Sequence, residues 1–149
     1  MKFRITILLC LSIICINLSK AQVQTGISQY NASKFGIKSD GVTLNTRSIQ
    51  KAIDWISEQG GGELTFWVGR YLTGSIHLKS NVTIRLQEGA VLEGSTNPYD
   101  YDRICGTYGL VIGEKCDNIN IVGKGNIIGH GRELGNNFAE QVHAGVLKD

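Results

Sequence analysis

The sequence predicts an all-β protein that folds as a parallel β-helix, a solenoid of stacked coils, with one short helix before the first coil. Three observations lead to this prediction. Nineteen glycines stand against a single proline among 149 residues, which is typical of a chain with many tight corners. Short apolar segments follow one another after Glu63. One pair of these segments recurs further along the chain, as expected for a repeated coil.

The helix is predicted over residues 45–59. Its apolar residues fall at i, i+3, i+4 and i+7 and form one stripe: Ile49, Ala52, Ile53 and Ile56. Asn45 or Thr46 can cap its start, and the glycines at 60–62 can end it because glycine accepts left-handed backbone. An open solenoid end would expose strand edges and apolar core, so we expect this helix to be the N-terminal cap.

Eight short strands are expected after the helix, at residues 64–67, 71–73, 76–78, 82–86, 90–92, 110–112, 119–122 and 126–128. The alternation of Val82, Ile84 and Leu86 sends every second side chain to one face. No Asn-Gly or Asp-Gly pair lies between these strands, so hairpins are not expected.

An internal repeat supports the coil. Residues 81–84 and 89–92 (Asn-Val-Thr-Ile and Gly-Ala-Val-Leu) are echoed by 118–121 and 125–128 (Asn-Ile-Asn-Ile and Gly-Asn-Ile-Ile). If residues 95–107 form an outward loop, about 24 residues remain for one coil, and residues 63–131 hold roughly three coils.

The repeat also predicts what its members do. Asn81 and Asn118 are expected at corners, because asparagine tolerates left-handed backbone and can hydrogen-bond from coil to coil. The apolar residues of both copies are expected to share one dry interior: Val82, Ile84, Ile119 and Ile121. The alternative is a small β-sandwich in which the similarity is coincidental.

Residues 1–21 have the features of a secretory signal peptide. Two basic residues precede a mostly apolar run over residues 5–16, and Ser19 and Ala21 lie where a signal peptidase reads. The run is shorter than the roughly 20 residues that span a bilayer, which argues against a membrane anchor. We expect cleavage after Ala21 and a secreted or periplasmic mature chain, residues 22–149.

The mature chain would carry 12 basic and 13 acidic side chains, because three of the 15 basic residues lie in the signal segment. This balance leaves no electrostatic case for binding nucleic acid or an anionic membrane. The mature chain would also keep Cys105 and Cys116, and a disulfide and two free thiols are equally compatible with an oxidising compartment.

Blocks of sequence in the coil region are similar to those of a known family. The most specific block is Gly-Arg-Tyr-Leu-Thr-Gly-Ser-Ile-His-Leu-Lys-Ser-Asn-Val at residues 69–82. Looser blocks lie at 35–41, 45–53, 89–92 and 125–129. Together they cover roughly residues 30–135, and they resemble the N-terminal part of the polygalacturonase-like glycoside hydrolases, family 28, within the pectin-lyase-type β-helix superfamily.

This resemblance implies a right-handed, single-stranded parallel β-helix. It also implies a monomeric hydrolase that cleaves glycosidic bonds of pectic polysaccharide with inversion and needs no cofactor or metal. A polysaccharide lyase on the same fold and a non-catalytic carbohydrate-binding β-helix are the alternatives. Unlike the family pattern, the chain has Trp67 and Val68 before the specific block, which should alter a corner but not the fold.

The active-site motifs of the family lie further along than the matched region, so no catalytic residue is expected in this chain and its substrate-binding residues are unassigned. We therefore expect the chain to be the truncated front part of a longer protein. Gly129-His130-Gly131 has the letters of one family motif, but no Asp-Asp pair precedes it. His130 is accordingly interpreted as a corner histidine.

The remaining candidates are local. Asp100 and Asp102 form the only acidic i, i+2 pair, in a loop after Pro98 with no strand to fix their separation. A catalytic pair and a calcium site are less favoured for them than a solvated loop that borders a groove. The neighbouring rings, Tyr99 and Tyr101, can either stack on a sugar or pack against the coils. His77, inside an apolar strand, is expected to be structural, whereas His143 has no assignment.

Overall fold

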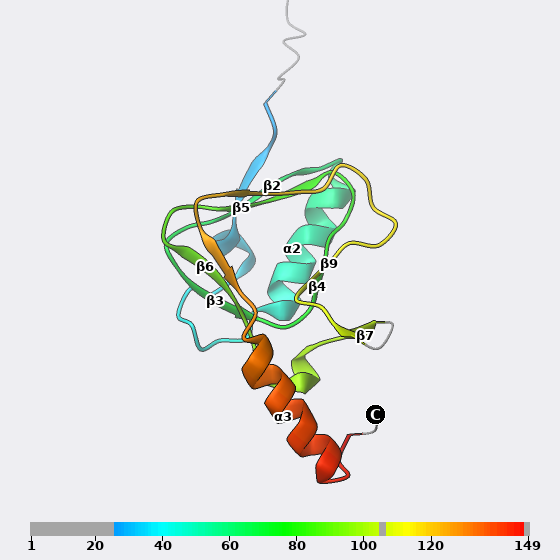
Figure 1. The fold of residues 1–149 in the computed structure, drawn as a ribbon. Helices are drawn as coiled ribbons and strands as arrows, with labels where there is room; N and C mark the ends of the chain where they lie inside the picture. The colour runs from blue at the N-terminus through cyan, green and yellow to red at the C-terminus, as the bar shows by residue number, and fades with distance from the viewer. Residues whose placement is uncertain (1–25, 105–106, 148–149) are drawn as a thin grey trace, which may run out of the picture.

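The structure, a computed structural model, describes residues 26–104 and 107–147 as a stack of parallel coils (Figure 1). The expected signal peptide, residues 1–21, lies outside the described residues. In order, the elements are β1 (Gln29–Asn31), η2 (Ala32–Phe35), α2 (Thr46–Glu58), β2 (Gly62–Phe66), β3 (Gly69–Thr73), β4 (Ile76–His77), β5 (Val82–Leu86), β6 (Ala90–Gly94), η3 (Pro98–Asp100), β7 (Arg103–Ile104), β8 (Thr107–Tyr108), β9 (Val111–Ile112), β10 (Asn120–Gly123), β11 (Asn126–Ile128) and α3 (Gly131–His143).

Three parallel sheets run along the stack. Their strand orders are β1-β2-β5-β10, β3-β6-β11 and β4-β9. Because β2, β3 and β4 follow one another in the chain but lie in three different sheets, each circuit of the chain is one coil, and Figure 1 shows the strands outlining a triangle. This parallel pairing is that of a β-helix, as predicted, and excludes the antiparallel sandwich.

The pairing register confirms one half of the predicted repeat and corrects the other. Ile84 pairs with Ile121, so β5 and β10 align as the sequence echo predicted. In the next sheet Leu92 pairs with Ile127, which sets Gly125 beside Ala90 rather than beside Gly89. The predicted alignment of this segment was wrong by one residue, because the chain between the paired positions of β10 and β11 is two residues shorter than between those of β5 and β6, whereas the echo allowed for one. Because side chains alternate along a strand, this one-residue difference makes Ile127 rather than Ile128 face the same side as Leu92.

The core fills the centre of the coils. Val82 and Ile84 are almost fully buried, and Ile119 packs against this core partly buried. Ile121 is 44% exposed, so the prediction that all four isoleucine and valine positions share a dry interior was wrong for this residue. Its strand, β10, is the last of its sheet in the described part of the chain, and no strand covers its far edge there.

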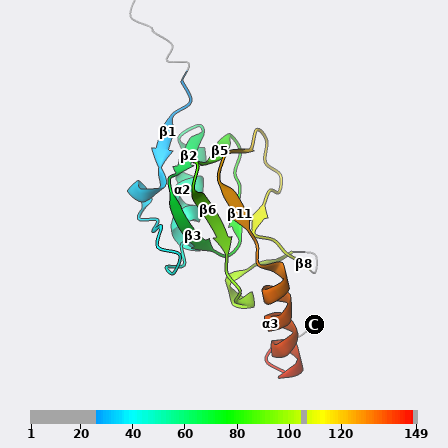
Figure 2. The same ribbon diagram turned by 60° about the vertical axis from the view of Figure 1, so that its left-hand side comes forward.

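The segment between β6 and β9 leaves the coil, as expected for residues 95–107. It contains η3 and a small antiparallel pair, β7 and β8. This hairpin was not predicted, because two-residue strands carry no periodic signal. Helix α3 was also not predicted; it has no buried residue and extends away from the coils beside this loop (Figures 1 and 2). Neither helix in the described ranges has the length and apolar content needed to cross a bilayer.

Helix α2 lies against the first coil. Its buried residues are the predicted stripe of Ile49, Ala52, Ile53 and Ile56. Gly60 and Gly61 follow the helix with φ of 94° and 114°, a conformation that favours glycine. The expectation that the Asn45 side chain caps the start of this helix was wrong. Asn45 occupies the N-cap position, but its buried amide bonds to the backbone of Lys38, Thr43 and Leu72 instead of to the helix.

Side chains of α2 also bond to the backbone of the segment around β4. The Gln50 amide accepts from the His77 N–H at 2.8 Å and donates to the His77 carbonyl at 3.0 Å. The Thr46 hydroxyl accepts from the Gly74 N–H, and the Ser57 hydroxyl donates to the Ser80 carbonyl. Backbone groups that would otherwise form an open strand edge are therefore paired by the helix.

Replacing Gln50 with leucine is expected to lower the free energy of unfolding by about 1–3 kcal/mol, because both His77 backbone groups lose their partner. Urea denaturation of the two proteins measures the difference. Lys51→Leu, at the exposed neighbouring position, is the control and should change stability by about 0.5 kcal/mol or less. Equal losses in the two variants would contradict the pairing role of Gln50.

Candidate functional site

The loop that carries the acidic pair is held firmly on the first coil. Its residues 98–100 form the short helix η3, in which Pro98 is buried. The Ser75 N–H donates to the Asp100 carbonyl at 3.1 Å, and the Ser75 hydroxyl accepts from the Asp102 N–H at 2.9 Å. Gly74 lies so close to Asp100 that a side chain on it would overlap the Asp100 backbone. The loop is therefore an ordered wall rather than a free solvated segment.

The two carboxylates of this loop have different partners. Asp100 accepts a short hydrogen bond from the Ser95 hydroxyl. Oδ2 of Asp102 lies 2.8 Å from Nε2 of His77, which is partly exposed on β4. The two carboxylates of the loop are therefore hydrogen-bonded to different neighbours, Ser95 and His77. Within the described ranges, no group of three or more His, Cys, Asp or Glu side chains could hold a metal ion.

The two tyrosines of the loop also differ in their burial. Tyr101 is buried, and its hydroxyl donates to the Ser95 carbonyl at 2.6 Å. Burial, with the Asp100 carboxylate nearby, raises the pKa of Tyr101 to about 12. Tyr99 is 58% exposed. Of the two possibilities, packing therefore holds for Tyr101, and Tyr99 is the ring that remains available to a ligand.

A hollow of about 490 Å³ lies between this loop and the start of α2. It is lined by Leu44, Thr46, Arg47, Tyr99, Asp100 and Asp102. The side chain of Arg47 has neither a hydrogen bond nor an ion pair to any residue in the described ranges. Sequence reasoning did not find Arg47, because an exposed basic residue in the first turn of a helix carries no signal of a site. Only the folded chain brings it to the acidic loop.

A charged network lies on the outer face of β3 and β6. The Arg70 guanidinium binds the Glu93 carboxylate, with Nε and Oε2 2.9 Å apart, and His130 Nε2 lies 2.9 Å from Glu93 Oε1. The bonds from Arg70 hold the pKa of Glu93 below its ordinary value, although partial burial opposes this. His130, with φ of 48°, forms the corner just before α3, where its side chain joins two coils.

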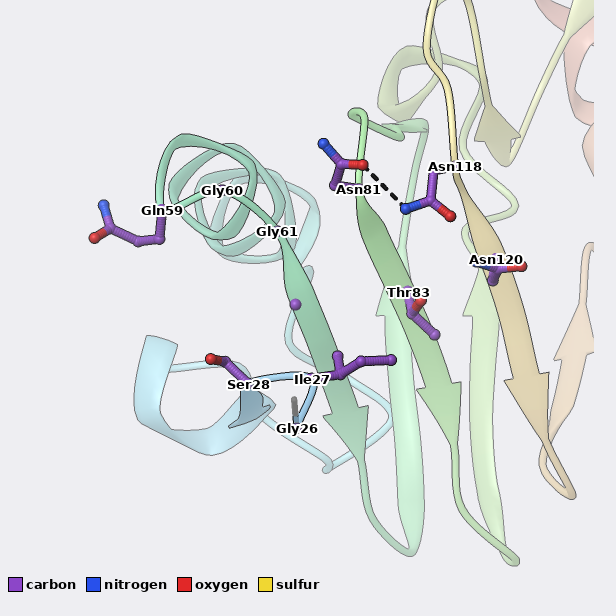
Figure 3. A pocket seen from close by; sticks show the side chains of 11 residues that line it. Gly26, Ile27, Ser28, Gln59, Gly60, Gly61, Asn81, Thr83, Asn118 and Asn120 are labelled. Carbon is purple, nitrogen blue, oxygen red and sulfur yellow. Dashed lines mark hydrogen bonds between the residues drawn. The ribbon is translucent and has the colours of Figure 1, made fainter. Parts of the chain in front are cut away.

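A second hollow crosses the coils at the asparagine corner (Figure 3). Asn81 and Asn118 have φ of 64° and 55°, and the Asn118 amide donates to Asn81 Oδ1 at 3.0 Å. Both parts of the asparagine prediction are thus confirmed. Thr83 and Asn120 continue the row along the sheet, and no charged side chain lines this hollow within the described residues. Its neutral amides and hydroxyls are hydrogen-bonding groups for uncharged polar ligands.

Two sequence candidates gain no role. His143 is the exposed last residue of α3. Cys116 is partly buried, and Cys105 lies outside the described residues, so the disulfide stays a prediction beside the alternative of two thiols. Trp67 and Val68 are exposed at the corner between β2 and β3.

Comparison with known proteins shows what the coils are similar to. No family model matches the chain. An exo-poly-α-D-galacturonosidase of Dickeya chrysanthemi is 36% identical over a match that covers 75% of this chain and 22% of that protein. The family 28 exopolygalacturonase of Yersinia enterocolitica is 35% identical with a TM-score of 0.62, over 70% of this chain and 21% of that one. The chain is a homologue of the family 28 polygalacturonases.

A third similar protein also has a solved structure. A Parabacteroides merdae protein assigned as a glycosyl hydrolase is 52% identical, with a TM-score of 0.78 over 82% of this chain and 53% of its own. The chain therefore spans about a fifth to a half of the length of these relatives. Its parallel coils are similar in structure to a part of the family 28 exopolygalacturonase.

Proposed function

We propose that the chain is the N-terminal part of a secreted or periplasmic hydrolase that cleaves glycosidic bonds of pectic polysaccharide by inverting hydrolysis. The similarity to an exo-poly-α-D-galacturonosidase and to a family 28 exopolygalacturonase carries this proposal. Residues 1–21 would be the export signal and residues 22–149 the start of a right-handed, monomeric β-helix. Helix α2 would be its N-terminal cap, because it covers the first coil and pairs with the backbone around β4.

The opposite end of the stack supports a continuing solenoid. Ile121 and Ile127 face the interior side of the last described coil, yet each is 44% exposed. Their strands, β10 and β11, end their sheets in the described part of the chain. Another coil stacked there would bury both side chains and pair both strand edges.

The chain of 149 residues by itself is not expected to hydrolyse pectin. An inverting enzyme needs two carboxyl groups about 6.5–9.5 Å apart with room for a water between them. Asp100 and Asp102 are instead bonded to Ser95 and His77. The catalytic carboxylates would belong to later coils.

Reducing-end assays on polygalacturonate test this proposal. The 149-residue chain should release no product, whereas the protein extended by the sequence that follows Asp149 in its gene should release reducing ends. A stop codon directly after Asp149, or hydrolysis by the chain alone, would contradict the proposal. An unsaturated product that absorbs ultraviolet light and disappears on chelation would identify a lyase instead. Binding without turnover by the extended protein would identify a carbohydrate-binding β-helix.

A further inference from the structure

We infer that the hollow between α2 and the 95–102 loop is a binding subsite for an uncharged pyranose, such as a neutral branch sugar of a polysaccharide. The hollow is lined by Leu44, Thr46, Arg47, Tyr99, Asp100 and Asp102. The choice of a pectic branch as the natural ligand depends on the proposed function. The recognition of a neutral sugar depends only on the chemistry of these side chains.

The hollow has a fixed aromatic surface. Tyr99 is 58% exposed, while its backbone N–H donates to Asn97 Oδ1 and the preceding Pro98 is buried. The same short helix is anchored through the bond from Ser75 to the Asp100 carbonyl. A ring presented on an ordered support loses little conformational freedom when it packs against a ligand. The apolar face of a pyranose is flat and of suitable size to pack against the Tyr99 ring.

The hollow also offers a donor and an acceptor that are free to bind hydroxyls. The side chain of Arg47 has no hydrogen-bond or ion-pair partner in the described ranges, so its guanidinium can donate. Asp102 is 65% exposed at its side chain, and only its Oδ2 is engaged by His77. Sugar hydroxyls both donate and accept, and the guanidinium on the α2 side and the carboxylate on the loop side of the hollow complement them.

The charges of the hollow select against a uronate. Two carboxylates, Asp100 and Asp102, face one guanidinium, Arg47, in the lining. A uronate would add a further negative charge near these carboxylates, which is unfavourable at short range and low salt. An uncharged sugar can use the same hydrogen bonds without this repulsion.

The test uses two tetrasaccharides as probes, β-1,4-galactotetraose and α-1,4-tetragalacturonate. Each is titrated into the chain of residues 22–149 at low salt and neutral pH. Amide chemical shifts report where each probe binds, and their concentration dependence gives Kd. We expect the neutral probe to shift residues of the hollow and to bind about tenfold or more tighter than the uronate. Tyr99→Ala should weaken the neutral probe about tenfold, and Trp67→Ala, at an exposed aromatic residue outside the hollow, should leave it unchanged.

A charge variant tests the electrostatic contribution to the preference for the neutral probe over the uronate. Asp102→Asn removes one negative charge and should narrow the preference for the neutral probe by about threefold or more. The inference is overturned if neither probe binds, if the uronate binds as well as the neutral sugar, or if Tyr99→Ala has no effect. Because no turnover is measured, these outcomes are independent of whether the extended protein is a hydrolase.

Discussion

Replacing Ile84 with alanine is expected to lower the free energy of unfolding by about 2–5 kcal/mol, the largest effect of any substitution considered. Ile84 is 1% exposed and lies in the middle of β5. Its strand neighbours are Leu64 of β2 on one side and Ile121 of β10 on the other. Neighbouring coils on both sides keep their backbones in place, so the missing side chain leaves a cavity rather than a collapsed core.

Ile121→Ala is the matched control for this prediction. It deletes the same atoms from the residue that pairs with Ile84, but Ile121 is already 44% exposed. Its loss of stability should be less than about half that of Ile84→Ala, because less apolar surface is removed from a buried place. Urea unfolding of the 149-residue chain with equal m-values measures both. Equal losses would show that Ile121 is buried in solution, and the open-ended coil stack would then be wrong.

Replacing Gly74 with alanine is expected to detach the 95–102 loop from the coils and to lower stability by about 1–3 kcal/mol. The added Cβ would overlap the carbonyl oxygen and carbon of Asp100. These are backbone atoms, which cannot turn away as a side chain would. The hydrogen bond from the Ser75 N–H to the Asp100 carbonyl would break. The wall of the hollow formed by Tyr99 and Asp102 would move with it.

Hydrogen exchange is the direct readout for Gly74. The Ser75 amide should exchange faster in Gly74→Ala, because its acceptor has moved away. Gly135→Ala is the control: a Cβ there has open space within helix α3, so it should leave Ser75 unchanged and stabilise the helix by about 0.5–1 kcal/mol. Unchanged protection of Ser75 in Gly74→Ala would contradict the close contact.

Much of the architecture was predictable because coil repeats leave local signals. Asn81 and Asn118 each precede an alternating apolar segment. They indicated corners because asparagine tolerates left-handed backbone. The alternation in β5 marked the inner face. The length of the corner between β10 and β11 was not predictable, because corners that differ in length by two residues can close the same turn, and this moved the alignment of Gly125 by one position.

The candidate site was predictable only in part. The acidic pair and its tyrosines were visible as a group, but whether Tyr99 or Tyr101 is buried depends on which ring meets the coil. Arg47 lies far from Asp102 in the sequence, and no local pattern connects them. Contacts of this kind arise from the return of the chain after each coil.

The sequence by itself determined the parallel coils and their asparagine corners, because alternation, glycine and asparagine act over a few residues. Only the tertiary structure decided that Ile121 is exposed, that Asn45 bonds to the loop and the coil instead of capping α2, and that Arg47 lines the hollow with Asp102. These outcomes depend on which strands and loops stack against one another. Stacking joins residues that are distant along the chain, and no local pattern encodes it.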